Sequence, residues 1–305
     1  MPLYMGIDAG GTKTDCAISN GAELLGQATA GSCKRTRVGD ETARQNLRQA
    51  ILHAAEAAHI PPRDIMQICI GITGASVPGT TAWVKSVIHE LTLGSVNVMG
   101  DQIVAHQAAF GRLPGVLVIA GTGSVAYGRN DRGETARAGG WGPMISDQGS
   151  AFWIGREAVG GVLKILDTGK TPDLLATIAG TWRVPGMEDI IRIANSEAHQ
   201  EFSELATAIA AAAEKGDTMA QSILQRAGRE LAQLAGSVIA RIWPAEKTVR
   251  IAMAGGVLQG SGIVRRAFQT SVQSEHANAA VSFAHVRPVL GALALAAMQG
   301  SPHVV

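Results

Sequence analysis

The segment IDAGGTKT, residues 7–14, lies between two apolar runs and decides how the chain is interpreted. Asp8 ends the first run, two glycines permit a tight turn, and threonine hydroxyls and a lysine follow. Such a loop directs backbone N–H groups and hydroxyls at a phosphate, while Asp8 is placed to hold a metal ion through water. The segment precedes a strand and lacks the Gly-x-x-x-x-Gly-Lys spacing of the P-loop, so it predicts a different phosphate-binding loop. From this segment alone, a Gly-Gly hairpin without catalytic meaning stays an alternative.

Similar glycine loops follow two other predicted strands. A buried strand over 115–120 leads into Gly-Thr-Gly-Ser at 121–124 and then into a strand over 125–129. Another buried strand, over 249–253, leads into Ala-Gly-Gly-Val at 254–257 and a helical pattern. Packing alone does not explain three glycine-bearing loops at three strand ends. They predict a clamp that closes on a nucleotide from two sides.

The composition excludes several classes of function. The chain has 305 residues and 46% hydrophobic content, enough for two domains with independent cores. A net charge of +1 gives no basic field for nucleic acid, and 4% aromatic content argues against a stacking platform for single strands. No apolar run approaches the ~20 residues needed to cross a bilayer, and no secretion signal begins the chain. We therefore expect a cytoplasmic protein with no nucleic-acid or membrane partner.

The three cysteines, Cys16, Cys33 and Cys69, are widely spaced and form no Cys-x-x-Cys pair. Neither a disulfide framework nor a zinc site is predicted. Cys16 and Cys69 lie in predicted strands and are expected to be small buried hydrophobic residues.

Predicted strands and helices alternate along the chain, which implies largely parallel sheets covered by helices. Hairpin signals occur at Asn20-Gly21 in the first part and at residues 130–133 in the second. In the first part, Asp40 stands as the expected N-cap of a helix that ends before Pro61. The other predicted elements of this part are strands at 3–7, 15–19, 23–29, 66–72 and 95–99 and helices at 80–91 and 102–110. In the second part, residues 149–243 are mostly helical, followed by helices at 262–274 and 289–298 and a strand at 281–284.

Together the motifs resemble the BadF/BadG/BcrA/BcrD ATPase family, in the N-acetylglucosamine kinase and glucosamine kinase branch of the sugar kinase, actin and heat-shock chaperone ATPase superfamily. Residues 139–142, Gly-Gly-Trp-Gly, with Ser-Asp-Gln-Gly-Ser-Ala at 146–151, resemble that branch specifically. The resemblance implies an α/β fold of two actin-like ATPase domains with duplicated ribonuclease H-like topology flanking a nucleotide cleft. The implied domains are 1–114 and 115–288, the latter with a helical insertion, and a C-terminal helix at 289–305 packs back on the first domain.

The resemblance also assigns a nucleotide site for ATP and Mg²⁺. Asp8 would position the Mg²⁺ ion through water, because magnesium keeps most of its hydration and binds few protein carboxylates. Lys13 would touch the terminal phosphates, or it is a solvated hairpin lysine. The loop at 255–256 would pass under the nucleotide, or it is a plain helix-start turn. The implied cofactor-binding residues are Gly10, Gly11, Thr12, Lys13, Thr122, Gly123, Gly255 and Gly256.

The implied catalytic base is Asp101, which follows a predicted strand, and its alternative role is the N-cap of a helix starting at Gln102. Asp147 would bind sugar hydroxyls, or it caps a helix from Gln148 onward. Trp141 would form part of the sugar pocket, or it is a core aromatic residue in a glycine turn. The implied substrate-binding residues are Thr73, Gly140, Trp141 and Asp147.

The chain departs from the family pattern at two places. Val125 stands where an asparagine facing the sugar is expected, and residues 33–35, Cys-Lys-Arg, stand where relatives offer an asparagine. A lysine near the sugar 2-position disfavours a cationic free amine by like-charge repulsion.

The expected reaction is therefore ATP-dependent phosphorylation of the 6-hydroxyl of an amino sugar, namely N-acetylglucosamine, by a homodimer. The alternatives are a glucosamine kinase and an ATPase activator subunit of a reductase or dehydratase. The missing cluster cysteines count against the activator.

Overall fold

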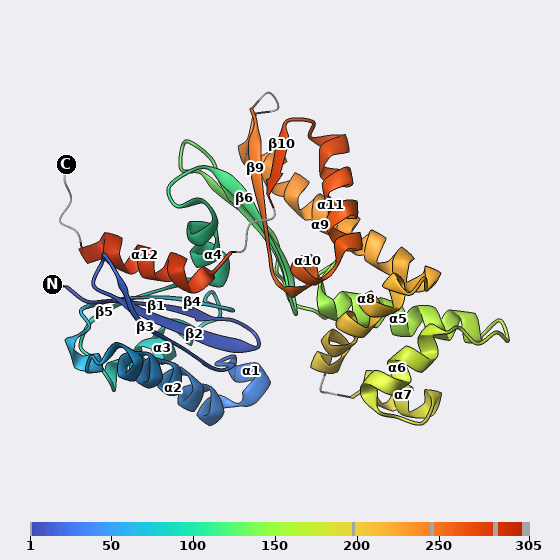
Figure 1. Cartoon of the computed structure of the whole chain (residues 1–305), viewed down its shortest axis with the longest axis horizontal. Helices are drawn as coiled ribbons and strands as arrows, with labels where there is room; N and C mark the ends of the chain where they lie inside the picture. The colour runs from blue at the N-terminus through green and yellow to red at the C-terminus, as the bar shows by residue number, and fades with distance from the viewer. Residues whose placement is uncertain (1, 197–198, 245–246, 283–285, 301–305) are drawn as a thin grey trace. The chain divides into compact units, whose positions relative to one another are not determined.

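The computed structural model describes residues 2–196, 199–244, 247–282 and 286–300. The chain divides into two compact units. Unit 1 contains residues up to Leu113 together with those from Val286 onward, and unit 2 contains Pro114–His285. Each unit is built on its own mixed sheet (Figure 1).

Unit 1 contains a five-stranded sheet in the order β3-β2-β1-β4-β5. Its strands β1, β2 and β3 form an antiparallel meander, whereas β4 and β5 run parallel to β1. The predicted Asn20-Gly21 turn joins β2 to β3, and Gly21 has a φ of 92°, which favours glycine. Because β1, β4 and β5 are parallel, their carboxyl ends lie at the same edge of the sheet. The strands are β1 (Tyr4–Ala9), β2 (Lys13–Ser19), β3 (Leu24–Gly31), β4 (Gln67–Ile72) and β5 (Ser95–Gly100).

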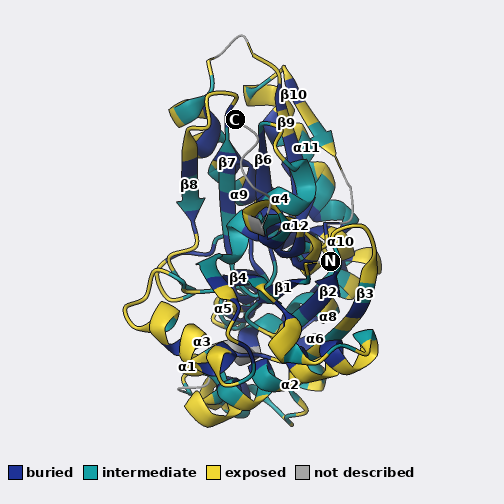
Figure 2. Cartoon of the chain, turned by 90° about the vertical axis from the view of Figure 1, so that its left-hand side faces the viewer, coloured by how far each residue is buried: buried dark blue, intermediate teal, exposed yellow. Residues whose placement is uncertain are grey.

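Helices cover this sheet. The long helix α2 packs against β2 and β3 through alanine, leucine and isoleucine side chains that recur at helical spacing, while its outer face is exposed (Figure 2). The helix begins at Asp40 after the N-cap Gly39, so the prediction that Asp40 is the N-cap is wrong. An acidic first-turn residue is favoured by the helix dipole and gives a similar sequence signal. The helices are α1 (Arg35–Val38), α2 (Asp40–Ala58), η1 (Pro62–Asp64), α3 (Thr80–His89), α4 (Asp101–Phe110) and α12 (Pro288–Gly300).

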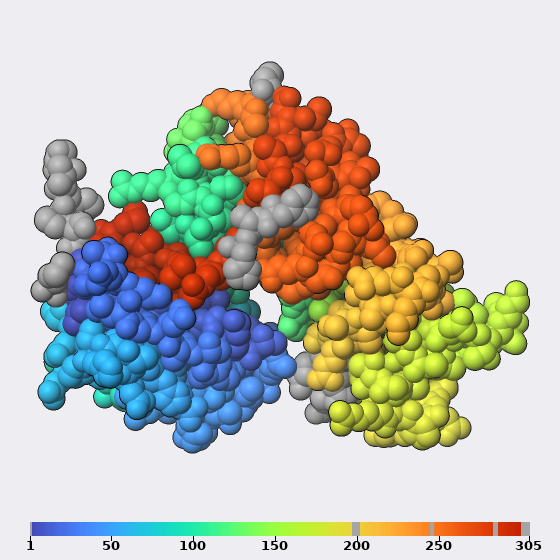
Figure 3. Space-filling view, viewed as in Figure 1, coloured from blue at the N-terminus to red at the C-terminus, as the bar shows by residue number. Residues whose placement is uncertain are grey.

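The last helix, α12, packs against β1, β4 and α4 of the same unit. In the space-filling view it lies directly beside the N-terminal part of the chain (Figure 3). Two glycines allow this close approach. A Cβ added at Gly6 would lie 2.2 Å from the Leu293 backbone nitrogen, and one added at Gly291 would lie 2.0 Å from the Val104 carbonyl oxygen. Both ends of the chain therefore complete one core.

Unit 2 repeats the topology of unit 1. Its five strands lie in the order β10-β9-β6-β7-β8, with an antiparallel meander from β6 to β8 and with β9 and β10 parallel to β6. The prediction at 281–284 corresponds to β10, whose observed bounds end at Ser282; positions 283 and 284 lie outside the described residues. The strands are β6 (Gly115–Ala120), β7 (Ser124–Arg129), β8 (Thr135–Gly139), β9 (Val249–Ala254) and β10 (Ala279–Ser282).

Helix α9 packs against β6, β7 and β8, and α11 packs on α9. The helical stretch predicted over 149–243 is present as several helices with short connections. Within the described ranges, no helix is long and apolar enough to cross a membrane. The helices are α5 (Ala151–Leu166), α6 (Leu174–Trp182), α7 (Met187–Ala194), η2 (His199–Glu204), α8 (Leu205–Glu214), α9 (Thr218–Ile242), α10 (Gly256–Gly260) and α11 (Gly262–Glu275).

The two sheets thus share one strand order and one pattern of parallel and antiparallel neighbours. The predicted α/β class with duplicated topology is confirmed. The short strand β8 was not predicted, because its sequence, Thr-Ala-Arg-Ala-Gly, contains only one residue with high strand propensity.

Candidate active site

The carboxyl ends of β1, β4 and β5 bring three predicted site residues together in unit 1. Asp8 lies near the end of β1, Thr73 directly follows β4, and Asp101 directly follows β5. The Thr73 N–H donates to the Ala9 carbonyl at 3.1 Å, which fixes Thr73 beside the end of β1. Its hydroxyl donates to Asp101 Oδ2 at 2.6 Å. The sheet topology therefore assembles a polar cluster from residues that are far apart in sequence.

Asp101 is the first residue of α4, and Gly100 is the N-cap, so the N-cap alternative for Asp101 is wrong. Its Oδ1 still accepts a hydrogen bond of 2.9 Å from the Gln102 N–H, so the carboxylate does interact with the start of its helix. The other oxygen faces the Thr73 hydroxyl. These two donors hold the carboxylate in one orientation, as a group that receives a proton from a bound alcohol requires.

Asp8 has a perturbed acidity. The pKa of Asp8 is raised from 3.8 to about 7, chiefly by burial and also by the negative charges of Asp101 and Asp15, while Lys13 lowers it. Part of the raised pKa thus comes from repulsion between two candidate site carboxylates. A cation beside Asp8 would relieve this repulsion. Among the described residues no group of three or more metal-ligating side chains is present.

The glycine loop between β1 and β2 is held in a defined shape. The Gly10 N–H donates to the Lys13 carbonyl at 3.0 Å. A Cβ added at Gly11 would meet no described atom within 4 Å, so the backbone there is open to a ligand. Thr12 is exposed. The Lys13 ammonium, exposed by 62%, pairs with Asp15 at 2.7 Å, so the structure places it on a neighbouring carboxylate of the same strand.

The equivalent loop of unit 2 lies between β6 and β7. The Gly121 N–H donates to the Gly123 carbonyl at 2.9 Å, and the Gly121 carbonyl accepts from Ala151 N–H at 2.8 Å. A Cβ added at Gly123 would lie 2.6 Å from Asp147 Oδ2. The loop that carries Thr122 and Gly123 is therefore in contact with the predicted sugar-binding carboxylate.

Asp147 is a buried carboxylate in an unusual backbone conformation. Its φ is 63°, in the left-handed region that few residues other than glycine adopt. The N-cap of the following helix α5 is Ser150, whose Oγ accepts the Trp153 N–H at 3.2 Å. The helix-cap alternative for Asp147 is therefore wrong. Strained backbone at a buried carboxylate is typical of functional sites.

Trp141 is exposed by 66%, so the alternative of a core aromatic residue is wrong. The Arg137 guanidinium lies 4.4 Å from its ring centroid. The flanking Gly140 and Gly142 both have positive φ, at 70° and 100°, so the backbone presents the indole from a tight turn. An exposed aromatic ring is a suitable surface for the apolar face of a sugar.

The loop after β9 contains two glycines with different environments. Gly255 has a φ of 93° and is the N-cap of α10, and a Cβ there would lie 2.4 Å from the Ala120 carbonyl oxygen. Packing against the end of β6 thus accounts for Gly255. A Cβ at Gly256 would meet no described atom within 4 Å. Gly256 is therefore the position of this loop that a ligand can approach.

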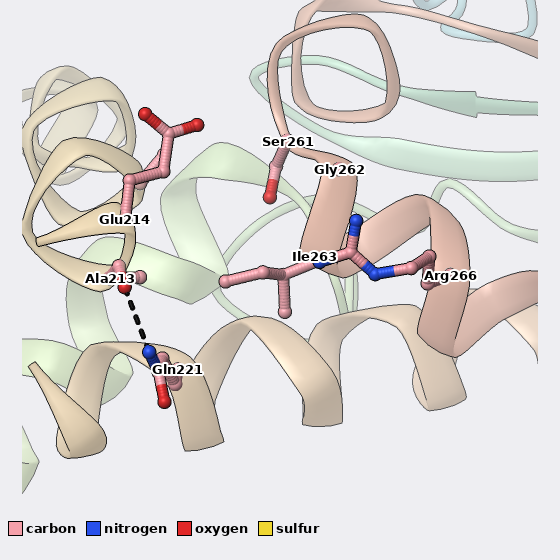
Figure 4. Close-up of a pocket in the computed structure, with 8 residues that line it drawn as sticks. Ala213, Glu214, Gln221, Ser261, Gly262, Ile263 and Arg266 are labelled. Atoms are coloured by element: carbon pink, nitrogen blue, oxygen red, sulfur yellow. Dashed lines mark hydrogen bonds between the residues drawn. The ribbon is translucent and has the colours of Figure 1, made fainter. Parts of the chain in front are cut away.

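A pocket of about 380 Å³ lies next to this loop within unit 2 (Figure 4). Helix α10 leads from Gly256 directly to Ser261, which lines the pocket, and α8 contacts α10. The volume is in the range of small-ligand pockets. Polar and apolar side chains contribute to its lining, and Gln221 Nε2 donates to the Ala213 carbonyl at 2.9 Å. The lining residues are Ala210, Ala213, Glu214, Gln221, Ser261, Gly262, Ile263 and Arg266.

Sequence reasoning missed two groups of residues. The Gly11 carbonyl accepts hydrogen bonds from Ser32 Oγ at 3.1 Å and from Arg37 Nη1 at 2.7 Å, a contact that no local pattern signals. The pocket residues on α8 and α11 lie in helices whose sequence pattern does not indicate a ligand site. The only signal near the first group was the departure from the family pattern at residues 33–35, Cys-Lys-Arg, where relatives offer an asparagine.

Comparison with known proteins identifies the family and the fold of the chain. A model of the BadF/BadG/BcrA/BcrD ATPase family matches residues 5–296. An N-acetyl-D-glucosamine kinase of Dictyostelium discoideum is 29% identical over 96% of this chain and 97% of its own length. An N-acetylmuramic acid/N-acetylglucosamine kinase of Clostridium acetobutylicum is 30% identical over 85% and 86%. The crystal structure of a Chromobacterium violaceum protein assigned as an N-acetylglucosamine kinase superposes with a TM-score of 0.78 at 22% identity, covering 97% of this chain and 99% of that one. This last likeness shows the fold, which is the actin-like ATPase fold of sugar kinases.

Proposed function

Because the chain belongs to the BadF/BadG/BcrA/BcrD ATPase family, we propose that it is an ATP-dependent kinase of an amino sugar. Its product would be the sugar 6-phosphate, together with ADP. The observation that carries the proposal is the cluster of Asp101, Thr73 and Asp8 at the carboxyl ends of three parallel strands. Ligand sites in open α/β sheets lie at such strand ends.

Asp101 is the proposed catalytic base. Phosphoryl transfer requires an aligned acceptor hydroxyl and a carboxylate that takes its proton as the new O–P bond forms. Thr73 and the Gln102 N–H fix both Asp101 oxygens, which retain lone pairs for the hydroxyl of a bound sugar. The proton of the sugar 6-hydroxyl would pass to Asp101 while the terminal phosphoryl group leaves ADP.

Asp8 is the proposed holder of Mg²⁺, through water. The ion would neutralise the charge of the phosphates and of the Asp8 and Asp101 carboxylates. The raised pKa of Asp8 supports this role, since a carboxylate crowded by other carboxylates gains most from a cation.

The nucleotide would be bound by loops and by the unit 2 pocket. Residues 11–13 of unit 1 and residues 122 and 123 of unit 2 are proposed to donate to phosphate oxygens, as the open backbone at Gly11 supports. Gly10 would shape the loop through its hydrogen bond to the Lys13 carbonyl. Gly256 would lie under the nucleotide, and the pocket that begins at Ser261 would take the adenine base. Lys13 would have to exchange its Asp15 partner for a phosphate, because the two are paired in the ligand-free chain.

The sugar would be held by Thr73 and by Gly140, Trp141 and Asp147. A buried carboxylate that accepts hydroxyl hydrogen bonds and an exposed indole match the polar edge and the apolar face of a hexose. Lys34 is proposed to lie near the sugar 2-position, where its positive charge would disfavour a free amine and favour N-acetylglucosamine. N-acetylmuramic acid, a sugar that carries a carboxylate, is included in the test below because the Clostridium relative is an N-acetylmuramic acid/N-acetylglucosamine kinase.

The redox-activator alternative is disfavoured by the cysteines. All three are buried free thiols, so none is presented at the surface where a cluster between subunits would need its ligands. The expected homodimer and the cytoplasmic location stay predictions, and light scattering of the purified protein checks the first of them.

The test is ADP release by wild-type protein with N-acetylglucosamine, glucosamine and N-acetylmuramic acid. We expect turnover that depends on sugar and is fastest with N-acetylglucosamine. Asp101→Asn should lower kcat by about 10²- to 10⁴-fold, as loss of a general base does. Asp131→Asn, an exposed aspartate paired with Lys247, is the matched control and should retain activity. Turnover that needs no sugar and survives Asp101→Asn would refute the proposal.

A further inference from the structure

One carbonyl of the first glycine loop has two side-chain donors. Ser32 Oγ lies 3.1 Å and Arg37 Nη1 lies 2.7 Å from the oxygen of Gly11. Both donors come from the segment that follows β3, which runs beside β2 up to Gly31. The donor from Arg37 is charged, and such hydrogen bonds are stronger than neutral ones. The Gly11 carbonyl is therefore held toward this segment.

Holding this carbonyl also orients the next N–H group. In a trans peptide the C=O of one residue and the N–H of the next point in opposite directions. The Thr12 N–H is thus directed away from Ser32 and Arg37. Neither it nor the Gly11 N–H has a hydrogen-bond partner among the described residues. The loop presents two backbone donors without a described partner, and the Thr12 N–H is held in one orientation. Such donors suit an anion.

The other arginine of this short helix does not share the role. Arg35 donates to Asp40 Oδ1 at 2.6 Å and lies 5.4 Å from the Trp83 ring centroid. The Arg37 side chain makes no ion pair among the described residues, and its hydrogen bond there is to the Gly11 carbonyl. No carboxylate among the described residues offsets the positive charge of Arg37 beside the loop.

We propose that Arg37, with Ser32, is a positioning residue that sets the Gly11–Thr12 peptide so that its N–H binds a phosphate oxygen of the nucleotide. This inference rests on the proposed function for the identity of the ligand. Arg37 touches the loop and not the reacting atoms, so it governs nucleotide affinity. Sugar affinity does not depend on it.

The test measures nucleotide binding and turnover in the full-length protein. Arg37→Met should weaken binding of Mg²⁺–ATP by about tenfold, the loss expected for one charged hydrogen bond, as measured by titration calorimetry. The KM for ATP should rise with it, while the KM for the sugar should stay unchanged. Binding of AMP, which lacks the outer phosphates, should weaken less. If Arg37 had only a structural role, Arg37→Met would weaken the binding of ATP, of AMP and of the sugar to a similar extent.

Three variants complete the design. Arg37→Lys should recover most of the affinity, because it restores a charged donor. Ser32→Ala should weaken ATP binding in the same direction and should add less than its full effect to Arg37→Met, because both donors share one acceptor. Arg48→Met removes an arginine of unit 1 that pairs with Glu90, and it should leave ATP binding unchanged. It controls for loss of charge alone.

The outcomes separate this inference from the proposed function. Unchanged ATP affinity in a folded Arg37→Met protein, or an equal loss in Arg48→Met, overturns the inference while the kinase activity stands. Wild-type protein that binds ATP without sugar-dependent turnover contradicts the proposed function, and the calorimetry still decides the role of Arg37. If Arg37→Met does not fold, Arg37→Lys and Ser32→Ala decide it. Failure of the wild type to bind ATP overturns both.

Discussion

Asp8, Thr73 and Asp101 form one electrostatic group at the residue scale. The hydroxyl of Thr73 stabilises the Asp101 carboxylate by a hydrogen bond, whereas no side chain in the described ranges donates to Asp8, whose pKa is raised chiefly by burial. Two neighbouring carboxylates cost folding free energy when both are ionised, because their charges repel in a partly buried site. The cluster thus lowers the free energy of unfolding of the chain, as groups in active sites commonly do.

This cost predicts a pH dependence of stability. The folded pKa of Asp8, about 7, is above its ordinary value of 3.8, so the native state binds this proton more tightly than the unfolded state. The native state therefore loses stability as pH rises from about 4 to 7, by a few kcal/mol at most. Asp8→Asn removes this loss and should unfold at a higher temperature than wild type at pH 8, with little difference at pH 4.

Asp64→Asn, at a side chain exposed by 54%, is the control and should show no such pH-dependent gain. Thermal unfolding of the three proteins across this pH range, in the absence of Mg²⁺, makes the comparison. An Asp8→Asn protein whose gain is the same at pH 4 and pH 8 would contradict the electrostatic account.

The sequence predicts the cluster well because it depends on strand order. Once β1, β4 and β5 are recognised as neighbouring parallel strands, the residues that follow them must converge. The left-handed conformation of Asp147 and the exposure of Trp141 could not be predicted, because both depend on how residues 139–150 fold as a loop. The bond from Arg37 to Gly11 joins residues 26 apart and depends on tertiary packing.

At the scale of elements, the short helix α10 connects two features of unit 2. It starts at the glycine loop after β9 and ends at Ser261, whose side chain caps α11 and lines the pocket. The loop and the pocket are therefore held in a fixed relation by a single turn of helix. This geometry suits a ligand that has a phosphate part and a flat base.

Filling the pocket tests its role. Ala210 on α8 lines the pocket and is half-buried, so Ala210→Trp should occupy the space. We expect ATP to raise the melting temperature of the wild type and to have no such effect on Ala210→Trp. Thr207→Trp lies on the same helix at an exposed position outside the lining, and it should leave the ATP effect intact. Retention of the ATP effect in a folded Ala210→Trp protein would place the base elsewhere.

Helices and buried strands were predictable from their periodicity, whereas helix starts were not. Both Asp40 and Asp101 begin their helices after a glycine N-cap. Aspartate is favoured at the N-cap and also in the first turn, so composition does not distinguish these positions. The pocket could not be predicted, because its lining comes from three helices whose packing is not encoded in any local pattern.

At the scale of the whole molecule, one topology occurs twice, and the last helix returns to the first unit. Each unit has the glycine loop at the same place, between the first two strands of its meander. The duplicated fold therefore explains why two similar loops occur more than a hundred residues apart. Unit 1 depends on both ends of the chain, because α12 contributes Val289, Ala292 and Ala296 to its buried core.

The close contact of α12 gives a stability prediction. A Cβ at Gly291 would lie 2.0 Å from the Val104 carbonyl oxygen and 2.6 Å from the Ala108 nitrogen, so Gly291→Ala forces the helices α12 and α4 apart. We expect a loss of about 1–3 kcal/mol and a lower unfolding temperature. Gly160→Ala is the matched control, since Gly160 is inside α5 with no described atom within 4 Å of the added Cβ. It should be neutral or stabilising by up to about 1 kcal/mol. Equal behaviour of the two variants in calorimetry would contradict the packing described for α12.

The identity of the product tests the central claim most directly. The claim is that a sugar hydroxyl is activated by Asp101 and takes the terminal phosphoryl group of ATP. N-acetylglucosamine incubated with Mg²⁺–ATP and wild-type protein should give ADP and an equal amount of N-acetylglucosamine 6-phosphate by mass spectrometry and ³¹P NMR, and Asp101→Asn should give almost none. ADP accompanied only by inorganic phosphate, with the sugar unchanged, would contradict the account.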